Sequence, residues 1–359
     1  MAALDEIKKL YEPRPYHNFG HALNVWEKII EFLNRGIKAN EELLYWSALL
    51  HDAGYGQDFK KLGFISNEHM HAQIAFDFLL NLGKDPQFCQ KVAETILATN
   101  PHIYPQTTEQ KLLRAADLSG LAADFSHYRE FYEKIKAEFP APDDLAFFRG
   151  NLLAITPYFW PMIRLTDNYY NQTGASDWHS RVANNIITNY RLIAAENNLE
   201  AWVIADIGSG INPVFLWRNG KNQLSFGIEP ERSSREGAQL LITANAKRRS
   251  NFAELIAPGI SAALPLPTGT VNEIILANVA LRNPQSLCSQ EFQRILIPNG
   301  KINIYEWYSP DLWCQGDTQD AKLLIAQALQ EFELTQDICI NHLRTSHYGS
   351  FQLSFSLPD

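Results

Sequence analysis

The chain has 359 residues, which is longer than a single hydrophobic core usually grows, so two domains are expected. Hydrophobic residues make up 46% and charged residues 20%, as in folded globular proteins, which excludes the disordered, collagen-like and coiled-coil classes. The formal net charge is -9, and acidic residues outnumber basic ones in both halves of the chain. We therefore expect no nucleic-acid or anionic-membrane partner, because both need a cationic surface.

The four cysteines are scattered and form no CxxC pair, which predicts neither a disulfide framework nor a zinc knuckle. The first residues contain no apolar signal-peptide core, and no run of about 18 apolar residues occurs. These features are typical of a cytoplasmic protein that does not span a membrane. A homo-oligomer is compatible with the sequence, which does not set the oligomeric state.

The pattern is helical from the start of the chain to about residue 135. Apolar residues recur at intervals of three and four, and glycines and capping residues separate the segments. The spacing predicts helices between residues 21 and 36, 40 and 54, 67 and 83, 87 and 98, and 109 and 123. No strand is expected before residue 200, which predicts an all-α domain.

Residues 140–196 combine several prolines with an aromatic content too high for a free linker. We expect this segment to be a helical extension that packs back on the first domain. The first domain is thus predicted to span residues 1–196.

From about residue 200 the pattern changes to short apolar or alternating runs of strand character. These runs lie at 202–207, 224–228, 273–279, 301–307 and 351–357. Their alternation with helical stretches predicts an α/β domain over residues 197–359 with a mostly parallel sheet. A turn at Gly349 predicts an antiparallel hairpin at the C-terminus.

Histidine is concentrated in the first part of the chain, where seven of the ten histidines precede residue 128. His51 and Asp52 stand together near the end of an apolar helix. Adjacent helical residues point about 100° apart, so both reach one ion only if other helices supply further ligands. His21 and Asp117 belong to two such helices, and a carboxylate in an apolar run needs a metal or an arginine partner.

Four motifs around these residues resemble the HD-domain metal-dependent phosphohydrolases. They are YHNFGHA at 16–22, LLHDAGY at 49–55, NEHMHA at 67–72 and RAADLSG at 114–120. The resemblance implies a helical HD bundle that holds a divalent metal ion and hydrolyses a phosphoester. The ligands that it implies are His21, His51, Asp52 and Asp117. Two imidazoles and two carboxylates suit Mn, Fe, Co, Ni or Zn, and Mg less well.

The same resemblance implies catalytic roles for Glu68 and Asp52, with Glu68 orienting water or relaying a proton. Arg14, Lys60 and Lys61 are candidates for binding substrate phosphate. His17 is a candidate for a hydrogen bond that supports the site.

Each of these residues also has a purely structural interpretation. The histidines can be core residues with satisfied hydrogen bonds, and Glu68 can be a first-turn acid that faces the helix dipole. The three cations can be ordinary surface charges. His69 and His71 can be extra ligands or exposed helix residues, and we expect them to be exposed.

A second candidate site lies at the start of the C-terminal domain. An apolar strand that contains Asp206 runs into Gly208 and Gly210, whose lack of a side chain lets a ligand approach the backbone. Glu229 ends the next strand, where an acid can accept hydrogen bonds from a ribose. Asn212 stands two residues after Gly210, at the next alternate position of this turn.

This half resembles the class I S-adenosylmethionine (SAM)-dependent methyltransferases, including the segments ALPLPTGTVNEIILANVAL and EFQRILIPNGKINIYEW. The resemblance implies a Rossmann-like sheet of seven strands with a C-terminal antiparallel hairpin. It also implies SAM binding by Asp206, Gly208, Gly210 and Glu229, although Asn212 replaces the family's third glycine. The alternative is that the glycine turn only packs.

The sequence thus predicts a two-domain fusion of an HD-type phosphohydrolase with a methyltransferase-like domain. The expected substrate is a small phosphorylated metabolite or nucleotide, because the acidic chain offers no track for a polynucleotide. In the main alternative, SAM-dependent methylation is the principal activity and the HD domain binds substrate or regulates. In a third interpretation both pockets sense ligands without catalysis.

Overall fold

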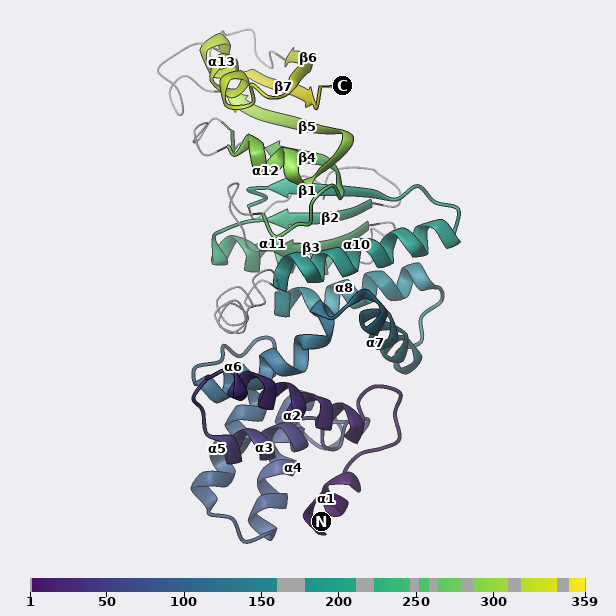
Figure 1. Cartoon of the computed structure of the whole chain (residues 1–359), viewed down its shortest axis with the longest axis vertical. Coiled ribbons are helices and arrows are strands. Elements are labelled where there is room, and N and C mark those ends of the chain that lie inside the picture. Colours follow the sequence, from purple (N-terminus) through teal and green to yellow (C-terminus); the bar gives the residue numbers. More distant parts are fainter. Residues whose placement is uncertain are drawn as a thin grey trace. The chain divides into compact units, whose positions relative to one another are not determined.

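The computed structural model describes the chain in nine segments (Figure 1). They are residues 2–159, 178–210, 223–245, 252–257, 264–277, 279–280, 287–308, 318–340 and 349–358. The chain divides into two compact units, and among the described residues one comprises 2–141 with Trp178 and the other comprises 142–159 and the residues from 179 onward. We call them the helical unit and the sheet unit.

The helical unit is built from short helices, of which α2 to α6 correspond to the predicted segments, while α1 and α7 were not predicted. In chain order they are α1 (Ala2–Lys8), α2 (Phe19–Asn34), α3 (Glu41–Leu50), α4 (Asn67–Asn81), α5 (Pro86–Leu97), α6 (Thr108–Asp117), the 3₁₀ helix η1 (Leu118–Ala122) and α7 (Phe125–Glu138). In the described residues no strand precedes Trp202, so the all-α prediction is confirmed for this unit.

Capping side chains set where these helices begin. The Asn18 carboxamide oxygen accepts the backbone N–H groups of Gly20 and His21, and the Asn40 side chain accepts that of Leu43. Such caps satisfy donors that the first helical turn leaves unpaired. Asn18 thereby fixes the first turn of α2, in which His21 lies.

One predicted helix is interrupted at a residue of the candidate site. The segment 109–123 is α-helical only to Asp117 and continues as η1. Buried Arg114, one turn before this break, donates to the carbonyl oxygens of Ala98, Asn100 and Ile103. These bonds tie the segment that follows α5 to α6, and so hold the position of Asp117.

The segment at residues 140–196, expected as a helical extension of the first domain, is helical in its described parts. Helix α8 (Asp144–Phe159) packs against strand β3 (Phe252–Ala257), and the ring of its Phe148 stacks on Tyr190 of α10 (Trp178–Glu196) at 5.7 Å. By their contacts, residues 142–159 and 179–196 group with the sheet unit. A mostly parallel sheet needs helices over its faces, and these helices supply part of that cover. Residues 160–177 of the extension lie outside the described residues.

The sheet unit contains a seven-stranded sheet of order β3-β2-β1-β4-β5-β7-β6 in the described part of the chain. The other strands are β1 (Trp202–Ile207), β2 (Gln223–Ile228), β4 (Val271–Ala277), β5 (Leu296–Tyr308), β6 (Glu333–Ile340) and β7 (Gly349–Ser356). Its remaining helices are α11 (Arg232–Asn245), α12 (Ser289–Ile295) and α13 (Thr318–Ala328). The first five strands pair in parallel, and β7 pairs antiparallel with both β5 and β6. The predicted parallel sheet with an antiparallel C-terminal hairpin is confirmed, while β3 and most of β6 were not predicted.

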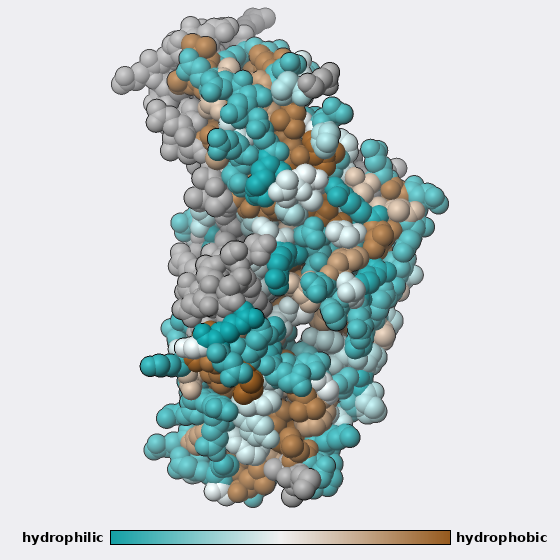
Figure 2. Space-filling model, in the orientation of Figure 1, coloured by the Kyte–Doolittle hydropathy of each residue, from teal (hydrophilic) through white to brown (hydrophobic). Residues whose placement is uncertain are grey.

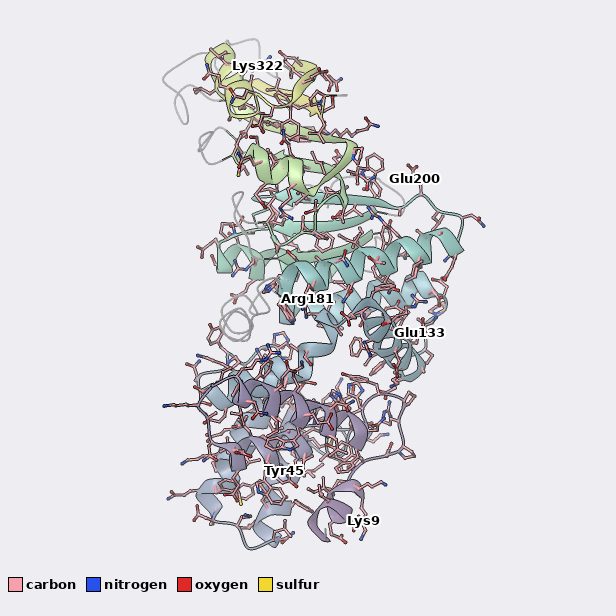
Figure 3. The ribbon with its side chains drawn as sticks, in the orientation of Figure 1. Lys9, Tyr45, Glu133, Arg181, Glu200 and Lys322 are labelled. Carbon is pink, nitrogen blue, oxygen red and sulfur yellow. The ribbon has the colours of Figure 1, made fainter. Side chains whose placement is uncertain are left out.

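The surface agrees with the composition. Hydrophilic residues cover much of the face in view on both units, with apolar residues between them (Figure 2). Charged side chains such as Lys9 and Glu133 lie on the outside of the helical unit (Figure 3). No helix among the described residues combines the length and the apolar composition that a membrane crossing requires.

Candidate metal centre

Two imidazoles from different helices meet inside the helical unit. His21 lies in the first turn of α2 and His51 is the C-cap of α3, and their Nε2 atoms are 3.3 Å apart. The other ring nitrogen of His51, Nδ1, is 2.8 Å from the carbonyl oxygen of Ala48 and can only donate to it. His51 Nε2 therefore carries the lone pair in the neutral ring and directs it at His21.

Two carboxylates complete the cluster. Asp117 Oδ1 lies 3.1 Å from His21 Nε2 and 3.6 Å from His51 Nε2. Asp52 Oδ2 lies 3.3 Å from His51 Nε2 and 3.6 Å from His21 Nε2. The four residues that the sequence singled out as ligands are thus brought together, and His51 is only 1% exposed.

Opposite charges shape the protonation of this cluster. Burial by itself lowers the pKa of His51, but the carboxylates of Asp52 and Asp117 outweigh burial and raise that pKa well above its usual range. Burial raises the pKa of both carboxyls, and the imidazoles outweigh it, so that both pKa values are lowered. A divalent cation can balance the negative charge of these carboxylates in place of protons on the imidazoles, because a metal ion displaces protons from its ligands.

The donor set fits a divalent metal ion in composition and spacing. A nitrogen of each histidine and an oxygen of Asp117 lie within 4.8 Å of one another. A transition metal holds N and O ligands at about 2.0–2.2 Å, so neighbouring ligand atoms in its shell are roughly 3.0–3.5 Å apart. The nitrogen–oxygen and nitrogen–nitrogen distances of 3.1–3.6 Å match this spacing. Two nitrogens and two carboxylates favour Mn, Fe, Co, Ni or Zn over Mg.

His17 lies beside the cluster and is fixed by an acid that the sequence analysis missed. Its Nδ1 is 2.6 Å from Oε2 of Glu138, the last residue of α7, and its ring stacks on Tyr55 at 3.7 Å. Glu138 Oε1 also accepts the backbone N–H groups of Tyr16 and His17, at 2.6 and 2.8 Å. Burial alone raises the pKa of Glu138, but these hydrogen bonds lower it to about 2. Glu138 is 121 residues from His17, and no local sequence signal links the two.

The three cations proposed to bind phosphate are placed differently from one another. Arg14 Nε is 3.5 Å from Glu138 Oε2, and its guanidinium lies over the Tyr55 ring, so Arg14 belongs to the surroundings of His17. Lys60 and Lys61 are exposed. Lys61 pairs with Asp58 at 3.2 Å, and Lys60 lies over the ring of Phe59. These contacts are those of surface side chains.

Helix α4 contains Glu68, a candidate catalytic residue, and the two histidines His69 and His71, which were expected to be exposed. Glu68 is partly buried and accepts a hydrogen bond of 3.0 Å from the Asn100 side chain. His69 is partly buried and its ring meets the Ser66 hydroxyl at 2.9 Å, whereas exposure was expected. His71 is only 2% exposed, with Nδ1 3.8 Å from Asp52 Oδ1, so its predicted exposure was wrong. His71 lies four and eight residues before Ala75 and Leu79, so it shares the buried face of α4.

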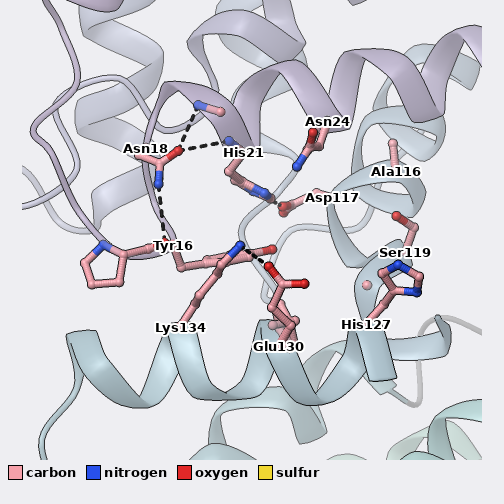
Figure 4. Close-up of a pocket in the computed structure, with 15 residues that line it drawn as sticks. Tyr16, Asn18, His21, Asn24, Ala116, Asp117, Ser119, His127, Glu130 and Lys134 are labelled. Carbon is pink, nitrogen blue, oxygen red and sulfur yellow. Dashed lines mark hydrogen bonds and ion pairs between the residues drawn. The ribbon is translucent and has the colours of Figure 1, made fainter. Parts of the chain in front are cut away.

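A pocket of about 320 Å³ opens beside the metal ligands. His21 and Asp117 line one side of it, and the α7 residues His127, Glu130 and Lys134 line the other (Figure 4). This places a small cavity next to the cluster, with basic and acidic side chains within it.

The second candidate site gathers at the carboxyl ends of β1 and β2. Gly208 and Gly210 have φ of 71° and 59°, in the left-handed region that favours glycine. Gly208 N donates to Ile228 O at 2.7 Å, and Gly210 N donates to Glu229 Oε2 at 3.0 Å. Asp206 is fully buried at the end of β1. The four predicted residues are therefore neighbours, while Asn212 lies outside the described residues.

Comparisons with known proteins bear on the two units separately. Similar solved structures include SAM-dependent methyltransferases from Methanosarcina mazei (12% identity, 46% of this chain and 97% of that chain, TM-score 0.36) and Aquifex aeolicus (13%, 47%, 89%, 0.35). A [4+2]-cyclase is similar to the same degree (13%, 49%, 82%, 0.35). Because these identities and scores are low, the fold of the sheet unit rests on its own strand order.

No curated protein is significantly similar to the chain. For the helical unit, residues 18–119 match the family model of the HD domain. The matched residues contain His21, His51, Asp52 and Asp117. Residues 18–119 thus match an HD domain, and the sheet unit has the Rossmann-like sheet with an antiparallel C-terminal hairpin that the sequence predicted.

Proposed function

We propose that this protein is a metal-dependent phosphohydrolase whose active site is the cluster in the helical unit. The observation that carries the proposal is that the two imidazole nitrogens lie 3.3 Å apart and that each lies 3.1–3.6 Å from an oxygen of Asp52 and an oxygen of Asp117. In this proposal His21, His51, Asp52 and Asp117 hold the ion. A divalent ion bound there supplies Lewis-acid polarisation of a phosphoryl oxygen and a nucleophilic water near neutral pH.

The surrounding residues have distinct roles in this proposal. The hydrogen bond from His51 to Ala48 fixes the ring in the tautomer that can ligate. Asp52 both ligates the ion and acts as a catalytic residue, with its Oδ2 3.3 Å from His51 Nε2. Glu68, held by Asn100, accepts a proton from the attacking water. Glu138 holds the His17 ring beside the cluster, where His17 can bind substrate together with Arg14.

The proposed substrate is a small phosphorylated metabolite or nucleotide. The pocket next to the cluster has a volume of about 320 Å³, at the lower end of the range for small-molecule sites. The net charge of -9 opposes binding of a long polyanion. Lys60 and Lys61 remain candidates for contact with a substrate phosphate, since both are exposed.

A reconstitution experiment tests the activity. The protein is stripped of metal with a chelator, reloaded separately with Mn, Fe, Co, Ni, Zn or Mg, and assayed for hydrolysis of phosphomonoesters and nucleotides. We expect activity only after reloading, and its loss in His51→Ala. His69→Ala is the control, because His69 contacts Ser66 rather than the cluster. Equal activity in stripped and reloaded protein would contradict the proposal.

For the sheet unit we propose SAM binding at the glycine turn. The observation in favour is that Glu229 lies at the end of β2 with its carboxylate 3.0 Å from Gly210 N, beside the turn. A ribose would bind to the Glu229 carboxylate, and the methionine part near Asp206, Gly208 and Gly210. If methylation is instead the principal activity, the HD domain supplies substrate binding or regulation. Calorimetric titration with SAM tests the site, and no heat at millimolar cofactor would refute it.

A further inference from the structure

The pocket beside the metal ligands has a wall that the proposed function does not use. One wall contains His21 and Asp117, and α7 forms the facing wall (Figure 4). The labelled side chains of Glu130 and Lys134 extend from α7 toward these two ligands. A molecule in the pocket would therefore contact the cluster and α7 together.

The α7 wall is a single face of that helix. His127, Glu130 and Lys134 are spaced by three and four residues, which places them on one side of an α-helix. Lys134 Nζ is 2.7 Å from Glu130 Oε1, and the two side chains are 48% and 62% exposed. A pair this accessible to water is weak, so Lys134 can exchange its carboxylate partner for another anion at small cost.

Two neutral polar groups also line the pocket. Within the part of the chain that the structure describes, the side chains of Asn24 and Ser119 have no hydrogen-bond partner. Asn24 lies in α2, the helix that also contains His21. Ser119 lies in η1, which directly follows Asp117. An amide and a hydroxyl at these places can bind the hydroxyl groups or phosphate oxygens of a ligand.

We propose that α7 is the substrate-binding helix of this site and that Lys134 binds the phosphate of a small phosphomonoester. The proposal rests on the proposed phosphohydrolase function and names the substrate class for it. The ammonium group of Lys134 supplies three donors to the phosphate oxygens, while Asn24 and Ser119 bind the organic part. In the free protein Glu130 pairs with Lys134 at 2.7 Å and competes with phosphate for it.

The size and charge of the pocket indicate which class of ligand it accepts. About 320 Å³ accommodates one phosphate with a small organic group. Glu130 adds a negative charge to the same wall, which disfavours ligands with several phosphates. The predicted ligand thus has a single phosphate and a compact leaving group.

The test measures binding of inorganic phosphate to metal-loaded protein by calorimetry. In Lys134→Met we expect the dissociation constant to rise about tenfold, the effect of one hydrogen bond to a charged group. The control is Lys136→Met, which removes the same charge from the same helix. Lys136 lies two residues further along, about 200° around the helix, and its Nζ is 3.7 Å from Glu133. We expect its phosphate affinity to equal that of the wild type.

Glu130→Gln provides a test with the opposite sign. It removes the competing carboxylate and one negative charge, so phosphate should bind a few-fold more tightly than to the wild type. Equal phosphate affinity in Lys134→Met and Lys136→Met, or weaker binding in Glu130→Gln, would overturn the proposal.

Activity and metal content separate this proposal from the proposed function. If the wild type hydrolyses phosphomonoesters with bound metal and Lys134→Met has an unchanged KM, only the role of α7 is refuted. If the metal-loaded wild type neither binds phosphate nor hydrolyses phosphomonoesters, both proposals fail. A raised KM in Lys134→Met with unchanged metal content supports both.

Discussion

The buried carboxylate of Glu138 offers a sharp test of how the surroundings of the metal centre are held. Its side chain is fully buried and accepts hydrogen bonds from Tyr16 N, His17 N and the His17 ring. Its pKa is about 2, against 4.5 for an ordinary glutamate. At about 1.4 kcal/mol for each pH unit, this difference corresponds to about 3 kcal/mol of stability at neutral pH.

Glu138→Gln keeps the shape of the side chain and removes its charge. We expect it to lower the unfolding free energy of the helical unit by about 3 kcal/mol at pH 7. Glu133→Gln is the control on the same helix, because Glu133 is 44% exposed and forms only surface ion pairs. Its cost should be below about 0.5 kcal/mol. The measurement is denaturant-dependent hydrogen exchange of peptides from α2, which reports on this unit alone.

The pH dependence of this difference in unfolding free energy provides a second test. Because folding lowers the pKa of Glu138, its contribution is complete above pH 4.5 and is lost as the pH falls through about 2. The difference between the wild type and Glu138→Gln should therefore shrink as the pH is lowered from about 5 toward 2. A difference below 1 kcal/mol at pH 7, or one that does not change with pH, would refute this reasoning.

Two further predictions concern single residues in each unit. Arg114→Met leaves the carbonyl oxygens of Ala98, Asn100 and Ile103 without their donor, so proteolysis between α5 and α6 should become at least tenfold faster; an unchanged cleavage rate would contradict the role given to Arg114. Gly208→Ala should destabilise the sheet unit by more than Gly269→Ala. Both glycines have positive φ, but at Gly208 the new Cβ would lie 2.6 Å from Val279, whereas at Gly269 no atom of the described residues lies within 4 Å. Thermal unfolding of the two variants measures the difference, and equal melting temperatures would contradict it.

The sequence predicted best what depends on local pattern. The bounds of β1 are those predicted, because an apolar run flanked by a glycine turn is a local signal. The cluster of His21, His51, Asp52 and Asp117 was found because motifs in a fixed order mark residues that a fold brings together. The sequence separation of these residues does not give the distances between their side chains, so the contacts of 3.1–3.6 Å are known only from the structure.

What the sequence could not predict depends on partners far along the chain. The aromatic content of residues 140–196 indicated burial without identifying the partner, and α8 packs against β3. In the sequence Glu138 resembles any exposed acid at the end of a helix. Only the folded structure shows that α7 places it next to His17. Lys134 shows no motif, and only the pocket that it lines distinguishes it from Lys136.

The metal content of the purified protein tests the central claim most directly. Elemental analysis of the wild type should find about one divalent transition metal per chain. His51→Ala should lose it, because this change removes the Nε2 atom that faces His21, Asp52 and Asp117. His69→Ala should retain it, since His69 contacts Ser66 instead. Equal metal content in the wild type and His51→Ala would contradict the assignment of this cluster as a metal centre.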